Sequence, residues 1–139
     1  MPFPALLKLC LLMGLLLIVS VIDIRKRVIP DWLCLCAAAT GLIGFHPANL
    51  LGLFAAAPLL AGAALKDGVG GGDIKLMAAI GLVLGLLKGL MALTAGLFAV
   101  LLYHAVTAGV CRLRNQEAPS AYPLAPFLTV GCIAAQFIV

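Results

Sequence analysis

Two aspartates, Asp23 and Asp73, are the residues of this chain whose type and position could do chemistry. Each stands where a long apolar run meets a charged segment. An ionisable group beside sequence that is apolar enough to cross a membrane has a high free-energy cost, so it is usually functional and has a partner. Two carboxyl groups in one site can divide the work of amide hydrolysis: one, ionised, takes a proton from the attacking water, and the other, protonated, donates to the carbonyl oxygen. The alternative is that both acids only form ion pairs with nearby basic residues.

Glycines crowd the approach to the second aspartate. Four of the five residues 68–72 are glycine, and Gly70, Gly71 and Gly72 directly precede Asp73. A backbone without side chains allows close approach, so this segment could pair with an extended substrate or offer N–H donors to a developing oxyanion. The alternative is a flexible turn between two helices. A phosphate-binding loop is not expected, because the Gly-Lys-Ser/Thr ending and a preceding strand are both missing.

Two further charged residues lie near these acids. Lys75 follows Asp73 by two positions and could support the site by its charge. Asp31 follows a proline, and we expect it to cap the next helix, with a third carboxylate near the site as the alternative. The five cysteines are scattered through apolar stretches without zinc-site spacing. Neither a metal nor another cofactor is therefore expected.

The composition indicates which kind of element must position the two acids. Of the 139 residues, 65% are hydrophobic and 10% charged, and the mean hydropathy is +1.24. A soluble domain of this length would need far more charge on its surface. The net charge of +4 does not indicate nucleic-acid binding, because the basic residues sit in short segments between apolar runs, without interleaved aromatics. The chain is expected to be an all-α polytopic membrane protein with one domain over residues 1–139.

Charges, glycines and prolines divide the apolar sequence into six candidate transmembrane helices. These are Ala5–Ile22, Trp32–Gly44, Leu50–Leu65, Ile74–Leu87, Gly89–Val110 and Tyr122–Val139. The first is expected to be an uncleaved span and not a signal peptide, because its basic cluster follows the apolar run. In this scheme Asp23 ends the first helix and Asp73 opens the fourth.

The basic residues predict the orientation of these helices. Seven of the nine Lys and Arg residues fall in segments on one side of the membrane, and only Lys8 and Lys88 fall on the other. Short loops rich in Lys and Arg stay in the cytoplasm. We therefore expect both termini to lie outside, and Asp23 and Asp73 to lie together at the cytoplasmic face.

Three segments together resemble a known family, the type IV prepilin peptidases, membrane aspartic proteases with a Gly-x-Gly-Asp motif. Residues 23–30, Asp-Ile-Arg-Lys-Arg-Val-Ile-Pro, resemble the end of the family's first catalytic helix. Residues 68–81, which contain Gly70-Gly71-Gly72-Asp73, are similar to its signature almost throughout. Residues 122–128 give a weaker match to the entry of the last helix. At position 31 the family usually has Asn, whereas this chain has Asp.

The resemblance implies a function and a cellular location. It implies an aspartic endopeptidase, a hydrolase with Asp23 and Asp73 as its catalytic pair, that removes short basic leader peptides from prepilins or pilin-like proteins. Removal of the leader peptide would take place at the cytoplasmic face of the inner membrane. Larger members carry a cytoplasmic insert with paired Cys motifs and also methylate the new N-terminus. That insert is not expected here, and the short length resembles the peptidase-only branch associated with tight-adherence pili.

Two functions from other classes remain as alternatives. A small proton-coupled transporter would use intramembrane acids to bind and release protons, but it predicts acids near the membrane midplane. A non-catalytic pilus-assembly protein would tolerate a decayed site, whereas Asp23, Gly70, Gly72 and Asp73 are all present. Removal of a leader peptide is therefore the favoured function.

Overall fold

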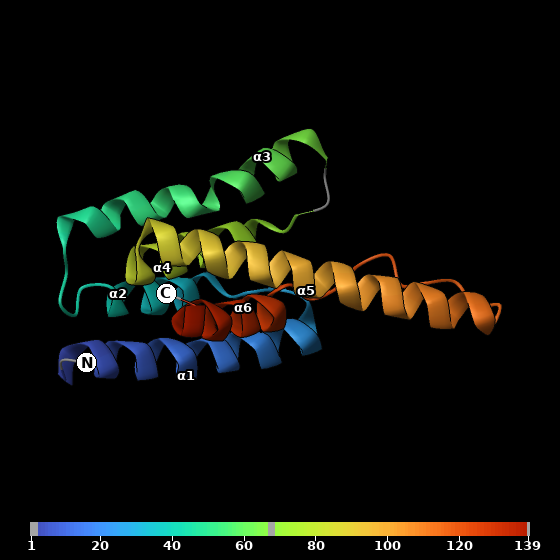
Figure 1. The fold of residues 1–139 in the computed structure, drawn as a ribbon, viewed down its shortest axis with the longest axis horizontal. Coiled ribbons are helices and arrows are strands. Elements are labelled where there is room, and N and C mark those ends of the chain that lie inside the picture. The colour runs from blue at the N-terminus through green and yellow to red at the C-terminus, as the bar shows by residue number, and fades with distance from the viewer. Residues whose placement is uncertain (1–2, 67–68, 139) are drawn as a thin grey trace.

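The protein is a bundle of helices in the computed structural model, which describes residues 3–66 and 69–138 (Figure 1). The elements in chain order are α1 (Phe3–Lys26), α2 (Asp31–Thr40), the 3₁₀ helix η1 (Pro47–Ala56), α3 (Ala57–Leu65), α4 (Gly71–Leu84), α5 (Leu86–Leu113) and α6 (Ala125–Ile138). Within these two ranges there is no strand. The predicted all-α fold is confirmed.

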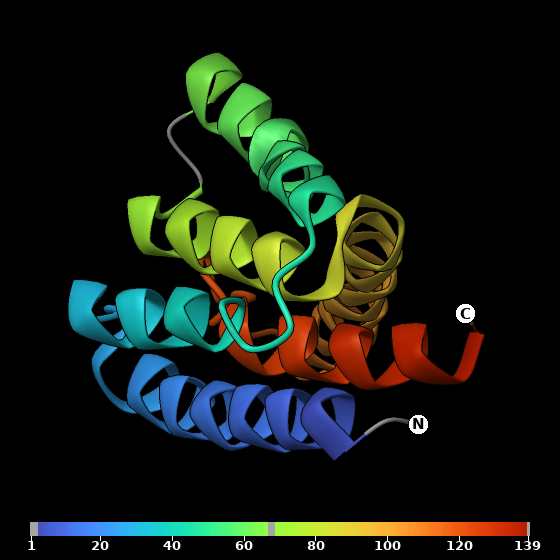
Figure 2. The same cartoon turned by 90° about the vertical axis from the view of Figure 1, so that its left-hand side faces the viewer.

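Helix α4 lies at the centre of the bundle. It contacts α2 on one side, η1 and α3 on another, and also α5, while α6 packs between α5 and α1. Figure 2 shows α1, α2, α4 and the η1–α3 segment as successive rows, with α6 and α5 beside them. The N-terminal end of α1 and the C-terminal end of α6 lie at the same end of the bundle in both views. The C-terminal end of α1 and the N-terminal end of α4 meet at the opposite end.

The outer surface of the bundle is apolar, as expected for contact with lipid. Three helical stretches are long and apolar enough to cross a bilayer: Phe3–Lys26, Pro47–Leu65 and Leu86–Leu113. Large apolar side chains are exposed on them, including Leu17, Phe54 and Phe98. A monomeric soluble protein rarely exposes so much contiguous apolar surface. The chain is therefore a multi-pass membrane protein.

The first and fourth helices are longer than the sequence predicts at the end of the bundle that carries Asp23 and Asp73. Helix α1 continues one turn past Asp23 to Lys26, because the carbonyl of Asp23 still accepts the N–H of Arg27 at 2.8 Å. Helix α4 begins at Gly71 and not at Ile74. The predicted boundaries at Ile22 and Ile74 are therefore wrong by about one turn, whereas the prediction that Asp23 lies at the end of one helix and Asp73 at the start of the other is confirmed. Both acids are inside terminal helical turns.

Other predicted boundaries also shift. The second helix ends at Thr40 and not at Gly44, and turn hydrogen bonds such as Leu42 N–H to Ala39 O follow it. The third predicted span begins as a 3₁₀ helix. The last helix begins at Ala125 and not at Tyr122, and its predicted end, Val139, lies outside the described residues.

Close backbone contact explains why α4 lies against η1. A Cβ atom added at Gly52 would collide with the carbonyl oxygen of Gly81, and one added at Gly81 would collide with that of Gly52. Membrane helices without a hydrophobic driving force between them associate through such small residues. This contact holds the centre of α4 and leaves its first turn at the end of the bundle, beside α1.

Candidate active site

The two aspartates line one cavity although they are far apart in the sequence. The cavity has a volume of about 220 Å³. It is lined by Asp23, Arg27, Val28, Ile29, Gly70, Gly71, Gly72 and Asp73. The segments in which the sequence predicts catalytic residues, the end of α1 and the glycine run before α4, therefore form opposite walls of the same recess.

Asp23 is held firmly by the elements around it. It follows Leu12, Leu16 and Val19 on the buried face of α1, and only 5% of its surface is exposed. Its Oδ2 accepts the backbone N–H of Ala125 at 3.0 Å. That N–H belongs to the first turn of α6, where amides have no partner within the helix. The carboxyl group of Asp23 therefore joins the end of α1 to the start of α6.

Asp73 has a looser environment. It lies in the first turn of α4 and is half-buried. Its Oδ1 atom is shielded from solvent and has no hydrogen-bond partner among the described residues. No hydrogen bond from the described residues therefore fixes this oxygen, in contrast to the carboxyl group of Asp23.

The three glycines before Asp73 differ in what surrounds them. A Cβ atom at Gly70 would lie 3.1 Å from Asp73 Oδ2, so glycine leaves room for the carboxyl group. A Cβ atom at Gly72 would lie 3.0 Å from the Cβ of Ile29, so glycine lets α4 pack against the segment after α1. Nothing lies within 4 Å of a Cβ atom at Gly71. Gly68, the first glycine of the run, lies outside the described residues.

Lys75 points away from the aspartate pair. Its Nζ donates to Asp31 Oδ1 at 2.8 Å, and both side chains are largely exposed. The two residues line a different cavity, with Cys34 between α2 and α4. Pro30 is the N-cap residue of α2, and Asp31 is the first residue of the helix, so the preferred interpretation of Asp31 as the helix cap is wrong. The carboxylate of Asp31 pairs with Lys75 of α4 instead.

A second cavity adjoins Asp73 on its other side. Its volume is about 300 Å³, and apart from Asp73 its lining is mostly apolar. The other lining residues come from α3, α5 and the segments before α4 and α6: Leu59, Val69, Leu97, Val100, Ser120, Ala121, Tyr122 and Leu124. Asp73 therefore stands between a recess that contains the other acid and a recess suited to apolar side chains.

Sequence reasoning missed the residues that fix Asp23. Ser20 Oγ and Thr129 Oγ1 lie 2.8 Å apart between α1 and α6, just below the hydrogen bond from Ala125 to Asp23. Ser20 precedes Asp23 by three positions and Thr129 follows Ala125 by four, which are the spacings of neighbours on a helix face. A search for polar residues at these spacings could have found the serine. The backbone amide of Ala125 leaves no trace in a sequence.

Comparison with known proteins was made by family and by individual relative. Residues 10–110 match the model of the type IV leader peptidase family. The chain is 39% identical over 134 residues to a prepilin leader peptidase/N-methyltransferase of Bacillus subtilis (strain 168). The match covers 88% of this chain and 52% of that relative, so the chain spans about half of the relative's length. No solved structure matches.

Proposed function

The chain belongs to the type IV leader peptidase family, and from this membership we propose that it is an aspartic endopeptidase that cuts the leader peptide from prepilins or pilin-like proteins. Asp23 and Asp73 are the catalytic pair in this proposal. The observation that carries it is the cavity of about 220 Å³ that both acids line. The B. subtilis relative named as a prepilin leader peptidase supports the choice of substrate.

The cavity provides what an aspartic mechanism needs. Its volume has room for several water molecules at about 30 Å³ each. One carboxylate takes a proton from a water molecule as the water oxygen bonds to the carbonyl carbon, and the other carboxyl group gives its proton to the carbonyl oxygen. The tetrahedral intermediate then breaks its C–N bond as the amine nitrogen takes up a proton from the first acid. The carbonyl re-forms as a hydroxyl proton of the intermediate passes to the second acid, so both acids end in their starting states.

The two cavities beside Asp73 suggest how the substrate lies. A leader peptidase substrate has a polar leader before the cut and an apolar segment after it. The mostly apolar cavity on the far side of Asp73 suits the apolar segment, because burying apolar side chains there removes them from water. The leader then extends past the glycines that line the aspartate cavity. Gly70, Gly71 and Gly72 form the edge that the substrate backbone approaches.

The location of the reaction follows from the charges at the two ends of the bundle. Arg25, Lys26 and Arg27 lie at the end of α1 that carries Asp23. By the preference of such clusters for the cytoplasm, the active site faces the cytoplasm from the inner membrane, and both termini lie outside. The transporter alternative is disfavoured because both acids lie in terminal helical turns and not midway along a helix.

We limit the proposal to the peptidase reaction. The connection between α5 and α6, residues 114–124, is the longest stretch without helix among the described residues. A domain of fewer than about 40 residues rarely folds without a metal, disulfides or a partner. No connection of this size can hold a methyltransferase domain.

The proposal is tested by expressing the protein with a prepilin and following leader removal as a gel shift. We expect Asp73→Asn to abolish the shift, because the amide can neither take up nor donate the required proton. Asp31→Asn is the matched control: it makes the same change at an acid outside the aspartate cavity, and we expect processing to continue. Unchanged processing by Asp73→Asn, or loss in Asp31→Asn alone, would show that the assigned pair is wrong.

A further inference from the structure

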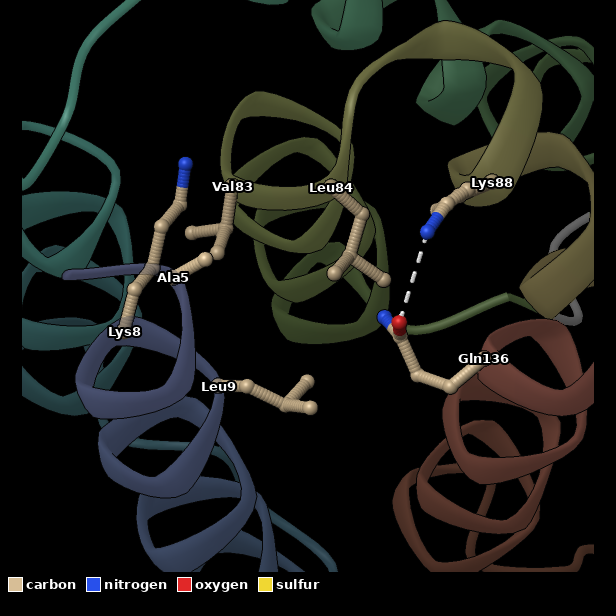
Figure 3. A pocket seen from close by; sticks show the side chains of 7 residues that line it. All are labelled: Ala5, Lys8, Leu9, Val83, Leu84, Lys88 and Gln136. Atoms are coloured by element: carbon tan, nitrogen blue, oxygen red, sulfur yellow. Dashed lines mark hydrogen bonds between the residues drawn. The ribbon is translucent and has the colours of Figure 1, made fainter. Parts of the chain in front are cut away.

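A cavity at the end of the bundle opposite the aspartates is lined by two lysines. Its volume is about 180 Å³. Lys8 comes from α1, Lys88 from α5 and Gln136 from α6, with Ala5, Leu9, Val83 and Leu84 as apolar lining (Figure 3). Lys8 precedes Asp23 by about four turns of helix. We call this site the lysine cavity, and the peptidase reaction makes no use of it.

The two lysines differ from every other basic residue in their burial. Lys8 and Lys88 are half-buried, whereas the other seven Lys and Arg side chains are exposed. They are also the two basic residues that the positive-inside pattern places on the far side of the membrane from the rest. Residues that are 80 positions apart thus line one recess, in which the Lys88 side chain turns toward Gln136 and the Lys8 side chain extends along the opposite side (Figure 3). A lysine buries its apolar stem and keeps its ammonium group accessible, so both ammonium groups are able to turn toward an anion at this recess.

The positive charge of the lysine cavity is not compensated by a carboxylate of the described chain. Its lining contains no acid. Within residues 3–66 and 69–138, the ion pair that forms is that of Lys75 with Asp31. Lys88 Nζ donates to Gln136 Oε1 at 3.4 Å, which is a neutral acceptor. Partly buried cations without a counter-charge are unfavourable, and an anion would relieve that cost.

From these observations we propose that the lysine cavity binds one phosphate group. Lys8 and Lys88 supply the charge, and the amide of Gln136 supplies a further polar contact. Lysine binds phosphate as a point charge and does not need the planar geometry of arginine. The cavity has room for about six water volumes, which accommodates a phosphate group with part of its hydration shell.

A phospholipid headgroup is the source that fits the position best. The lysine cavity lies at one end of a bundle whose flanks are apolar, and Leu9 and Leu84 are among the residues that line it (Figure 3). Basic pockets between membrane helices on the cytoplasmic side bind anionic headgroups, and the same attraction between charges acts on this pocket at the outer end of the bundle. Free phosphate offers the same chemistry and is the other source. An anionic lipid at this site would tie α1, α5 and α6 together away from the active site.

The proposal is tested by native mass spectrometry of the full chain in a non-ionic detergent. The protein is titrated with dioctanoyl phosphatidylglycerol, with dioctanoyl phosphatidylcholine, and with inorganic phosphate. We expect one saturable phosphatidylglycerol molecule. Lys8→Gln or Lys88→Gln should each weaken its binding about fivefold and the double variant about thirtyfold, from roughly 1 kcal/mol per lysine. Inorganic phosphate that displaces the lipid and binds with equal affinity identifies free phosphate as the source, and persistent lipid binding identifies the headgroup.

Matched variants separate this site from general attraction of anions. Arg112→Gln removes a charge from the other end of α5 and should leave the saturable binding unchanged. Lys8→Arg and Lys88→Arg keep the charge and should retain binding, and circular dichroism reports whether each variant keeps its helices. Equal binding by the wild type and the double Lys→Gln variant overturns the proposal. Equal weakening by Arg112→Gln overturns it as well.

Discussion

The structure holds the carboxyl groups of the two aspartates in different ways. Asp23 is inside a long helix, is almost fully buried, and accepts a hydrogen bond from the first turn of α6. Asp73 is in the first turn of a shorter helix, follows a run of glycines, and has one carboxyl oxygen without a partner. The difference indicates that the site joins a fixed acid with one that has room to adjust. Catalytic groups often reach their working geometry only when the substrate binds.

The largest expected effect treats the two acids as one unit. Asp23→Asn and Asp73→Asn should each lower kcat for leader removal by about 10² to 10⁴, the usual contribution of a positioned acid or base. The double variant should be no slower than the slower single variant, because residues that act together lose their effect together. The measurement is single-turnover cleavage of a purified prepilin. Losses that multiply in the double variant would indicate two independent roles.

Truncating each aspartate to alanine should change the free energy of unfolding by different amounts. Asp23→Ala leaves the amide of Ala125 buried without an acceptor and should lower the free energy of unfolding by about 1 to 3 kcal/mol. Asp73→Ala removes an oxygen that already lacks a partner and should change the same quantity far less. Both are measured by dodecyl sulfate titration in mixed micelles. Equal losses would mean that Asp73 is held as firmly as Asp23.

Two alanine substitutions in the glycine run before Asp73 form a matched pair, because one meets a neighbouring side chain and the other does not. Gly72→Ala places a methyl group 3.0 Å from Ile29 Cβ, and crowding of this kind should destabilise the protein by about 1 to 3 kcal/mol. Gly71→Ala meets nothing within 4 Å and should stabilise the helix by about 0.5 to 1 kcal/mol. The same micelle titration measures both. A destabilising Gly71→Ala would mean that this glycine is needed for a contact made elsewhere.

The smallest expected effect concerns the hydroxyl pair beneath Asp23. Ser20 and Thr129 share two protons among three contacts, to each other and to the carbonyls of Leu16 and Ala125. A double-mutant cycle of Ser20→Ala and Thr129→Val should give a coupling free energy of about 0.6 kcal/mol, the average for hydrogen bonds between membrane helices. Ser20→Ala with Thr94→Val, which lies on another helix, is the control and should show no coupling. A coupling of zero for the first pair would show that each hydroxyl serves only its own helix.

The aspartate cavity could be anticipated from the sequence because its determinants are local. Apolar stretches of membrane-spanning length predict helices, and the charged segments between them predict which ends meet. Asp23 and Asp73 each adjoin such a segment, so an even number of crossings between them places both at one end of the bundle. The all-α fold and the shared recess follow. The catalytic roles of the two residues stay predictions until variants are measured.

Only the tertiary structure decided which contacts the charged and polar groups make. Helix α1 is mostly apolar, so apart from the spacing of Ser20 and Asp23 its sequence has little pattern that identifies the buried face on which Asp23 lies. Three such contacts join residues from different helices. They are the ion pair of Lys75 with Asp31, the hydrogen bond from the amide of Ala125 to Asp23, and the cavity that Lys8 and Lys88 both line. Such contacts depend on how helices pack and rotate against one another, and side-chain composition within one helix does not determine that arrangement. The sequence by itself therefore determined the presence of the helices and the candidate pair of acids, and packing determined where the helices end and which partner each charge finds.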